Sequence, residues 1–349
     1  MAGVSLLLGL PASGQAKLVL PEQRTELIRR AHVWQPVDVA SMDLLNGPQG
    51  EGAHRAGEEV LCKYEEKDPK KPIGGSGRKF PCWDAAGTRL KVKYSPENNP
   101  EVFGEVAGTR LFWALGFYAE RLYSVKILCD NCPVDPFVSS STARSQRVFE
   151  PATIQFRLRG EEVSEVQDEG WNFEDLERID EKVGGSSRAE VDALRLLAVF
   201  VNHGDNTINQ QRLLCPEGDA ACARPIMYVT DLGGTFGGKD YFTSFKNWSK
   251  KAKIWEDPVR CIADFRGTME SFTDPKISEA GRKFLADLMA KLSDKQIRDL
   301  FMGARFDVLG KLENPVIGND GRVRKVTVDD WVRVFKDKRD QIIKVKCPE

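Results

Sequence analysis

The stretch from residue 188 to 237 constrains the fold most, because it passes from a helical pattern through a polar loop into two short apolar runs. Ser187 and Glu190 form a capping box at its start, and apolar residues recur at helical spacing up to Val201. Residues 202–210 are almost entirely polar. The pattern therefore predicts a helix that leads directly into a polar loop.

Two short strands are expected after this loop, at 211–215 and 226–229, joined by a turn that begins and ends with proline. The second strand leads into Asp231, which is followed closely by two glycines. A hairpin of this kind would hold Asp205 of the loop near Asp231.

Two aspartates in this order suit phosphoryl transfer. One carboxylate orients the attacking hydroxyl, while the other carboxylate and an amide oxygen hold Mg²⁺ on the phosphates. The His-Gly-Asp motif at 203–205 resembles that of aminoglycoside-phosphotransferase-like members of the protein-kinase-fold superfamily, and Asp-Leu-Gly at 231–233 stands where the family has Asp-Phe-Gly. The resemblance implies catalytic roles for His203 and Asp205, with ATP and Mg²⁺ as cofactors.

The metal site departs from the family pattern. The family places a metal-binding Asn five residues after the catalytic Asp, whereas this chain has Gln210 there and Asn209 one position earlier. We therefore expect the metal ligands to come from Asn209, Gln210 and Asp231. The alternative is a solvated helix, loop and hairpin whose aspartates merely cap turns.

A phosphate-binding region is expected upstream, where strands at 59–64, 79–83 and 88–94 form a meander. A glycine-rich loop between the first two strands contains Gly74, Gly75, Ser76 and Gly77, whose backbone amides suit phosphate, although such a run is also typical of a linker. Alternation in the third strand gives it one apolar face and one face with Lys91 and Lys93. Either lysine is a candidate for the α/β-phosphate contact.

The next helix has a clear start and end. Asn99 is its expected N-cap, Pro100 its first residue, and it stops near Gly116. Glu105 lies inside it, and the run resembles the Glu-bearing helix of toxin-type and secretory-pathway kinases, which implies an ion pair with the strand lysine. The alternative is that the strand lysine and Glu105 form no ion pair and that each side chain is exposed to solvent.

Further strands at 122–128 and 153–158 would complete a lobe of five strands. The expected fold is α+β and two-lobed, protein-kinase-like, with a small antiparallel β lobe carrying one helix and a larger, mainly helical lobe. The expected divisions are a possible signal peptide at 1–16, an N-terminal extension at 17–57 packed outside the first lobe, an N-lobe at 58–160 and a C-lobe at 161–349. An adenine-contacting hinge is expected near 158–165, and helices are expected at 279–292, 294–303 and 328–343.

Composition excludes some partners. The 51 Lys and Arg residues nearly balance the 52 Asp and Glu residues, so no basic field points to nucleic acid. No apolar run approaches the length of a membrane span, so no integral membrane segment is expected in the mature chain.

The first residues and the cysteines favour export to the periplasm or secretion. Residues 1–16 have an apolar centre followed by Pro and small residues, which resembles the later part of a signal peptide but lacks its basic start. Eight cysteines, an even number, favour an oxidising compartment.

Two disulfides are plausible from position alone. Cys215 and Cys222 bracket a turn, and Cys62 and Cys82 lie on adjacent expected strands. The spacing of Cys129 and Cys132 also permits half of a zinc site, although no second pair completes it.

These features together predict an ATP-dependent phosphotransferase that moves the γ-phosphate to the hydroxyl of an unknown acceptor. Its partners would be a nucleotide and that acceptor. One alternative is a catalytically inactive kinase-fold protein that binds a nucleotide or a partner. Another is a disulfide-rich extracytoplasmic interaction module without a nucleotide site.

Overall fold

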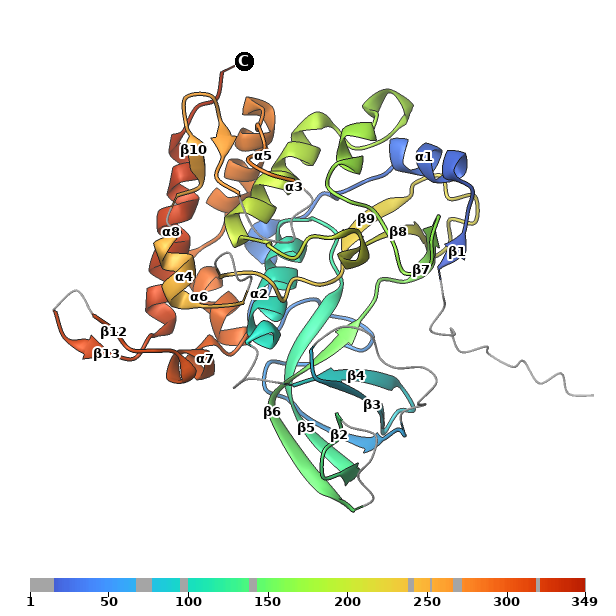
Figure 1. Cartoon of the computed structure of the whole chain (residues 1–349), viewed down its shortest axis with the longest axis vertical. Helices are drawn as coiled ribbons and strands as arrows, with labels where there is room; N and C mark the ends of the chain where they lie inside the picture. Colours follow the sequence, from blue (N-terminus) through green and yellow to red (C-terminus); the bar gives the residue numbers. More distant parts are fainter. Residues whose placement is uncertain are drawn as a thin grey trace, which may run out of the picture.

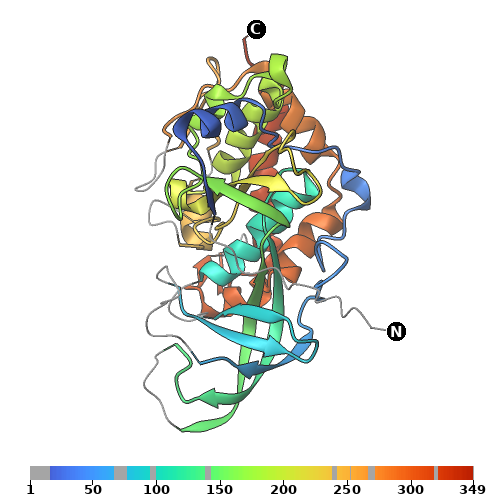
Figure 2. The ribbon, with the colours of Figure 1, turned by 90° about the vertical axis from the view of Figure 1, so that its right-hand side faces the viewer.

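The chain has an α+β fold, in which a β-barrel lies at one end of the molecule and most of the helices lie at the other (Figures 1 and 2). The computed structural model describes residues 16–66, 77–94, 100–137, 143–237, 242–251, 253–265, 272–317 and 321–348. Of the expected glycine-rich loop, it describes only Gly77, and the expected signal peptide lies outside it apart from residue 16.

The barrel is formed by five strands in the order β2-β3-β4-β6-β5. The strands are β2 (Glu59–Tyr64), β3 (Lys79–Asp84), β4 (Arg89–Lys93), β5 (Arg121–Pro133) and β6 (Arg144–Phe156). The predicted meander β2-β3-β4 is confirmed as antiparallel. The expectation of a purely antiparallel sheet is wrong at one place, because β2 pairs with β5 in parallel and thereby closes the barrel.

Alternation explains what fills the barrel and what covers it. Inward-facing residues such as Phe80, Leu90, Val92 and Ile154 make a core separate from that of the helices. Two disulfides belong to this part, the expected Cys62–Cys82 bridge between β2 and β3 and a Cys129–Cys132 bridge within β5. The second bridge overturns the zinc alternative, since both thiols are consumed.

The larger part combines helices with a four-stranded sheet in the order β1-β7-β8-β9. The sheet strands are β1 (Lys17–Leu18), β7 (Gly160–Ser164), β8 (Gln211–Pro216) and β9 (Ile226–Val229), and β8 and β9 form the predicted hairpin, stapled by the expected Cys215–Cys222 bridge. The longer helices are α3 (Arg188–Val201), α5 (Glu279–Ala290), α6 (Asp294–Gly303) and α8 (Val328–Lys344), which confirm the helices expected from their N-terminal caps.

Shorter elements complete the helical part. They are α4 (Phe245–Lys250), α7 (Phe306–Leu312), the ribbon β10 (Trp255–Asp257) with β11 (Ile262–Ala263), the ribbon β12 (Val316–Ile317) with β13 (Val323–Arg324), and the 3₁₀ turns η1 (Val39–Ser41), η2 (Asp175–Arg178), η3 (Glu181–Val183) and η4 (Ile208–Gln210). A Cys261–Cys347 bridge ties the turn before β11 to the end of the chain. Within the described segments, no helix is long and apolar enough to cross a membrane.

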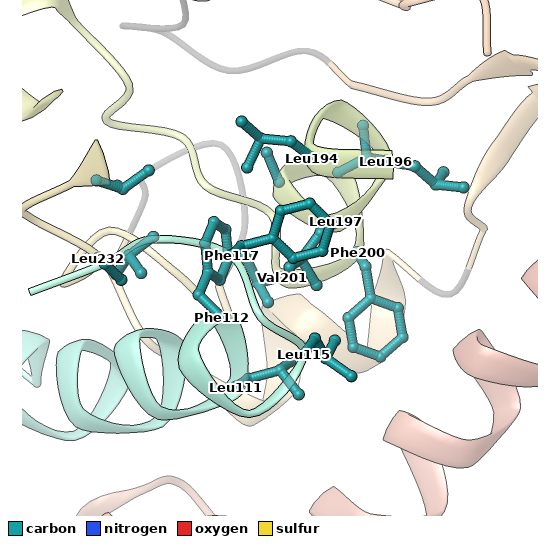
Figure 3. Packing of buried hydrophobic residues seen from close by; sticks show 14 of the residues in the cluster. Leu111, Phe112, Leu115, Phe117, Leu194, Leu196, Leu197, Phe200, Val201 and Leu232 are labelled. Carbon is teal, nitrogen blue, oxygen red and sulfur yellow. The ribbon is translucent and has the colours of Figure 1, made fainter. Parts of the chain in front are cut away.

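Helix α2 (Glu101–Ala114) lies where the two parts meet, and nearly all of its side chains are buried (Figure 1). Its C-terminal half packs with α3, and Leu111, Phe112 and Leu115 lie close to Leu197, Phe200 and Val201 in Figure 3. Pro100 is the N-cap rather than the first helical residue, and the expected cap Asn99 lies outside the described residues. The helix stops before Gly116, as predicted.

The N-terminal extension divides between the two parts, so the expectation that it packs outside the first lobe holds only for its end. There, Tyr123 Oη donates to the Pro48 carbonyl at 2.7 Å, and Gly57 N–H donates to the Ser124 carbonyl at 2.8 Å, which attaches this end to β5.

The first residues of the extension pack on the helical part instead. Helix α1 (Pro21–Arg29) buries Ile28 in the core of the helical part, and Arg24 donates a 2.7 Å hydrogen bond to the Asp175 carboxylate. Strand β1 pairs with β7. An amphipathic helix shows which face is buried, but its periodicity does not show what covers that face.

Candidate functional site

The barrel side of the candidate site is the outer face of β4. Leu90 and Val92 point into the barrel, so Lys91 and Lys93 share the opposite face. Lys93 is 9% exposed and forms an ion pair with Glu105 of α2, whose carboxylate is 1% exposed. The predicted strand-lysine to helix-glutamate contact is therefore present, and its partner is Lys93.

Two further carboxyl groups, those of Asp231 and Glu120, act electrostatically on Lys93 of this ion pair. Burial opposes the charge on Lys93, but Asp231 and then Glu105 raise its pKa above the usual lysine range. Burial raises the pKa of Glu105 to about 7, although Lys93 opposes this shift. We regard the pair as ionised because the two charged groups are in direct contact and Asp231 adds a second anion beside the lysine.

Lys91 is held differently from Lys93. Burial and the neighbouring positive charge of Lys93 lower the pKa of Lys91 to about 8. The side chain is half-buried and makes no hydrogen bond to the described residues. Lys91 is therefore free to contact a ligand, whereas Lys93 is already positioned by Glu105.

Asp231 follows β9 and packs beside the first turns of α2. The N–H of Gly233 donates to Asp231 Oδ1 at 3.3 Å. Burial opposes ionisation, but Lys93 and this backbone donor lower the pKa of Asp231 below its usual value. The carboxylate is thus ionised at neutral pH, as a ligand for a divalent cation must be.

The segment after Asp231 fits closely against α2. A Cβ on Gly104 would lie 3.2 Å from the Gly233 carbonyl and 2.2 Å from Thr243 Oγ1, and a Cβ on Gly108 would lie 2.9 Å from Leu232 Cβ. Thr235 Oγ1 donates to the Gly104 carbonyl at 3.1 Å. The two helical glycines therefore permit a close approach that places Asp231 beside the Lys93–Glu105 ion pair.

The polar loop is fastened at both ends. Helix α3 ends at Asn202 in a left-handed conformation (φ 54°), which asparagine tolerates better than most residues. Gly204 N–H donates to the Gly234 carbonyl at 3.0 Å, and Asn206 Nδ2 donates to the His203 carbonyl at 2.8 Å. The Gly204 bond joins the start of the loop to the segment after Asp231, and the Asn206 bond is internal to the loop. At the other end, Thr230 N–H donates to the Gln210 carbonyl at 2.9 Å.

The carboxyl group of Asp205 interacts electrostatically with that of Asp231. Burial and the negative charge of Asp231 raise the pKa of Asp205, while Gln210 Nε2 donates to Asp205 Oδ2 at 3.2 Å and opposes the shift. The prediction that the hairpin brings the two aspartates together is consistent with this coupling. A carboxylate with a raised pKa suits proton acceptance from an alcohol.

His203 is fully buried, and neither ring nitrogen has a hydrogen-bond partner among the residues described. Burial lowers the pKa of His203 to about 4, against the opposing effect of Asp231. The imidazole is therefore neutral at physiological pH. It lies beneath the loop rather than at its surface.

The remaining predicted residues divide into two groups. Gly74, Gly75 and Ser76 lie outside the described residues, so the phosphate-loop prediction stays untested. Gly77 is described and lies at the start of β3, near Glu101 of α2. Asn209 is exposed, and its carbonyl accepts a 2.6 Å hydrogen bond from Arg212.

The donor set suits a hard cation. Among the described residues, no three His, Cys, Asp or Glu side chains converge on one point. Asp231 with the amide oxygens of Gln210 or Asn209 would leave room for water and phosphate oxygens, which Mg²⁺ prefers to a complete protein cage.

Sequence reasoning missed three polar residues beside the lysines. Glu120 precedes β5, and Thr153 and Gln155 lie opposite Lys93 and Lys91 on β6. Alternation along β6 places Thr153 and Gln155 on one face, a signal that was available. Glu120 lies between elements, where no periodicity applies.

Comparison with protein-family models gave no match, and neither did comparison with curated proteins. Among solved structures, the chain is similar to the Helicobacter pylori proinflammatory kinase CtkA. The TM-score is 0.42 and the sequence identity 14%, over 79% of this chain and 94% of that chain.

Proposed function

We propose that this protein is an ATP-dependent phosphotransferase with a two-lobed, protein-kinase-like fold. The barrel and α2 would form the small lobe, about 58–160, and the helical part would form the large lobe, 161–349. One observation carries the proposal: a buried strand-lysine to helix-glutamate ion pair lies beside an aspartate that follows a hairpin. This is the arrangement that orients nucleotide phosphates and a divalent cation in phosphoryl transfer.

Lys93 would bind a phosphate oxygen, because Glu105 fixes its ammonium group beside Asp231. Lys91 is the alternative phosphate contact. The glycine-rich residues 74–77 would cover the phosphates, and the connection near 158–165 would contact the adenine.

Asp231 would hold Mg²⁺, which when bound neutralises charge on the β- and γ-phosphates. Gln210 is suited to two contacts at once, because its amide nitrogen already donates to Asp205 and its amide oxygen remains for the cation. Asn209 is the other proposed ligand. Gln210 would thus link the metal ligand set to the base.

Asp205 would accept the proton of the acceptor hydroxyl as its oxygen attacks the γ-phosphorus and the bond to ADP breaks. The raised pKa of Asp205 favours this proton transfer. His203, fully buried and neutral, would support the loop from below and have no direct contact with the acceptor.

The four disulfides support a location in the periplasm or outside the cell, since such bonds persist in oxidising compartments. Free-thiol titration of denatured protein from its native source tests this location. Mostly reduced cysteines would contradict it.

The test of the proposed function separates binding from chemistry. Wild type, Asp205→Asn and Asp231→Ala would be incubated with labelled Mg-ATP and an extract of candidate acceptors, and Mg-ATP affinity would be measured in parallel. We expect Asp205→Asn to lower transfer by about 10²–10⁴-fold with affinity nearly unchanged. We expect Asp231→Ala to lose the thermal stabilisation that Mg-ATP gives.

Each alternative function has its own outcome. Wild type that binds Mg-ATP without transfer or hydrolysis would favour the inactive kinase-fold protein. Wild type that is not stabilised by Mg-ATP would favour the interaction module. Undiminished transfer by Asp205→Asn would show that Asp205 is not the base.

A further inference from the structure

A set of polar side chains lies beside Lys93, and apart from Lys91, the alternative phosphate contact, none of them has a role in the proposed transfer. We call Lys91, Glu120, Thr153 and Gln155 the Glu120 cluster. On the outer face of the barrel, Lys91 is paired in register with Gln155 and Lys93 with Thr153. The cluster therefore continues directly from the lysine that is proposed to bind phosphate.

The cluster contains more acceptors than the chain satisfies. Gln155 Nε2 donates to Glu120 Oε2, but Glu120 Oε1, Gln155 Oε1 and Thr153 Oγ1 have no partner in the described parts of the chain. Glu120 and Thr153 are each 1% exposed. An unpaired buried polar group costs about 1–3 kcal/mol, so this arrangement suits a ligand that donates hydrogen bonds.

The position of the cluster fits the far end of a nucleotide. Lys91 is two residues from Lys93 on the same face, about 7 Å along the strand. Glu120 N–H donates to the Val229 carbonyl at 3.0 Å, two residues before Asp231. Lys91 and Gln155 are only half-buried, so a ligand with phosphates at Lys93 meets them before it reaches Glu120.

We propose that Lys91, Glu120 and Gln155 select the nucleotide by its base and require an exocyclic amine on that base. The inference rests on the proposed function. The amine supplies N–H donors to Glu120 Oε1 and Gln155 Oε1, and the Lys91 ammonium donates to a ring nitrogen or carbonyl oxygen. Adenine, guanine and cytosine meet this requirement, whereas hypoxanthine and uracil lack the amine.

Selection follows from the cost of leaving the acceptors unpaired. A site built around hydrogen-bond acceptors rejects an analogue that lacks the matching donor, because binding then seals the acceptors away from water without a partner. The loss of one donor is expected to weaken binding by about 5- to 150-fold, in line with the cost of one unpaired buried group.

The experiment measures Mg-dependent binding of ATP, ITP, GTP, UTP and tripolyphosphate to the full chain by calorimetry. The variants are Gln155→Leu and Glu120→Gln, with Gln146→Leu on the exposed part of β6 as the matched control. Wild type and control are expected to bind ATP and GTP at least about 5-fold more tightly than ITP and UTP. Gln155→Leu should reduce this preference several-fold and leave tripolyphosphate affinity unchanged.

Three results would overturn the proposal in distinguishable ways. Equal affinity of wild type for ATP and ITP would remove base selection and leave the proposed function intact. An equal loss of affinity for tripolyphosphate and for ATP in Gln155→Leu would show that the cluster only supports the structure. A wild type that binds no Mg-polyphosphate at all would overturn the proposed function together with the inference. Glu120→Gln keeps the shape of the side chain, so it provides the comparison if Gln155→Leu does not fold.

Discussion

The two sides of the candidate site are built in different ways. On the barrel side, Lys93 and Glu105 are buried on a strand and a fully packed helix, and their contact depends on sheet register and on the core around α2. On the helical side, Asp205 is half-buried on a loop and is held by one side-chain hydrogen bond. The proposed binding residues are thus part of the packed core, whereas the proposed base lies on a loop outside it, so the two sides should respond differently to substitution.

The largest effect is expected for Lys93→Met. The substitution keeps the apolar stem but leaves the carboxylates of Glu105 and Asp231 without their cation. Removing one partner of a buried ion pair costs about 3–5 kcal/mol, and Mg-ATP affinity should fall as well. Urea unfolding and calorimetry would measure both changes. Lys63→Met, at an exposed position on β2, is the control and should alter neither by much. A Lys93→Met protein as stable as wild type would remove the contrast between the two sides.

An intermediate effect is expected from the helical glycines that bring the two sides together. Alanine at an exposed helical position would stabilise by about 0.5–1 kcal/mol relative to glycine. At Gly104, however, the new Cβ meets the carbonyls of Thr235 and Gly233 at 3.1 and 3.2 Å, as well as the nearer Thr243 hydroxyl. We expect Gly104→Ala to destabilise by about 1–3 kcal/mol, as overpacking does, and to weaken Mg-ATP binding because Asp231 is displaced.

Gly108→Ala, on the same helix, is the control for this substitution and introduces a milder steric conflict. Its Cβ would meet Leu232 Cβ at 2.9 Å and its next neighbour at 3.3 Å, whereas a Cβ at Gly104 would meet three atoms at 3.2 Å or less. A smaller loss of stability is therefore expected at Gly108. Equal losses, or a gain at Gly104, would mean that the close fit of α2 does not position Asp231.

Local rules predicted the elements well where pattern and capping agreed. The bounds of β2 and β9 match the expectation, and α3 and α6 begin where their capping boxes indicate. The start of β6 was misplaced, because Pro151 argues against a strand interior. In the structure, the pairing register between β5 and β6 shifts at this proline. At such a bulge, the residue does not need a backbone N–H for an inter-strand hydrogen bond.

The candidate site could be predicted only in part. Asp205 and Asp231 were proposed from their sequence motifs and from the short hairpin between them, which restricts how far apart they can lie. The sequence could not show whether Lys91 or Lys93 pairs with Glu105, because both lysines lie on the same strand face. Only the structure shows that the partner is Lys93. Glu120 gave no sequence signal, since it enters the site through a backbone contact with β9 that no periodicity encodes.

The smallest effect is expected for the stability of Asp205→Asn, and its sign depends on pH. Burial and Asp231 raise the pKa of Asp205 in the folded state, so the ionised form is less favourable there than in the unfolded chain. The stability that this residue contributes is therefore present below its unfolded pKa and is lost as pH rises through the folded value. At pH 7 the neutral Asn should make the protein slightly more stable than wild type, by less than about 1 kcal/mol. The difference should shrink at acidic pH, as the wild-type carboxyl takes up its proton. Urea unfolding of both proteins at pH 7 and at acidic pH, with chelator present, measures this difference. A variant less stable than wild type at pH 7 would show that Asp205 supports the fold, and the two sides of the site would then be built alike.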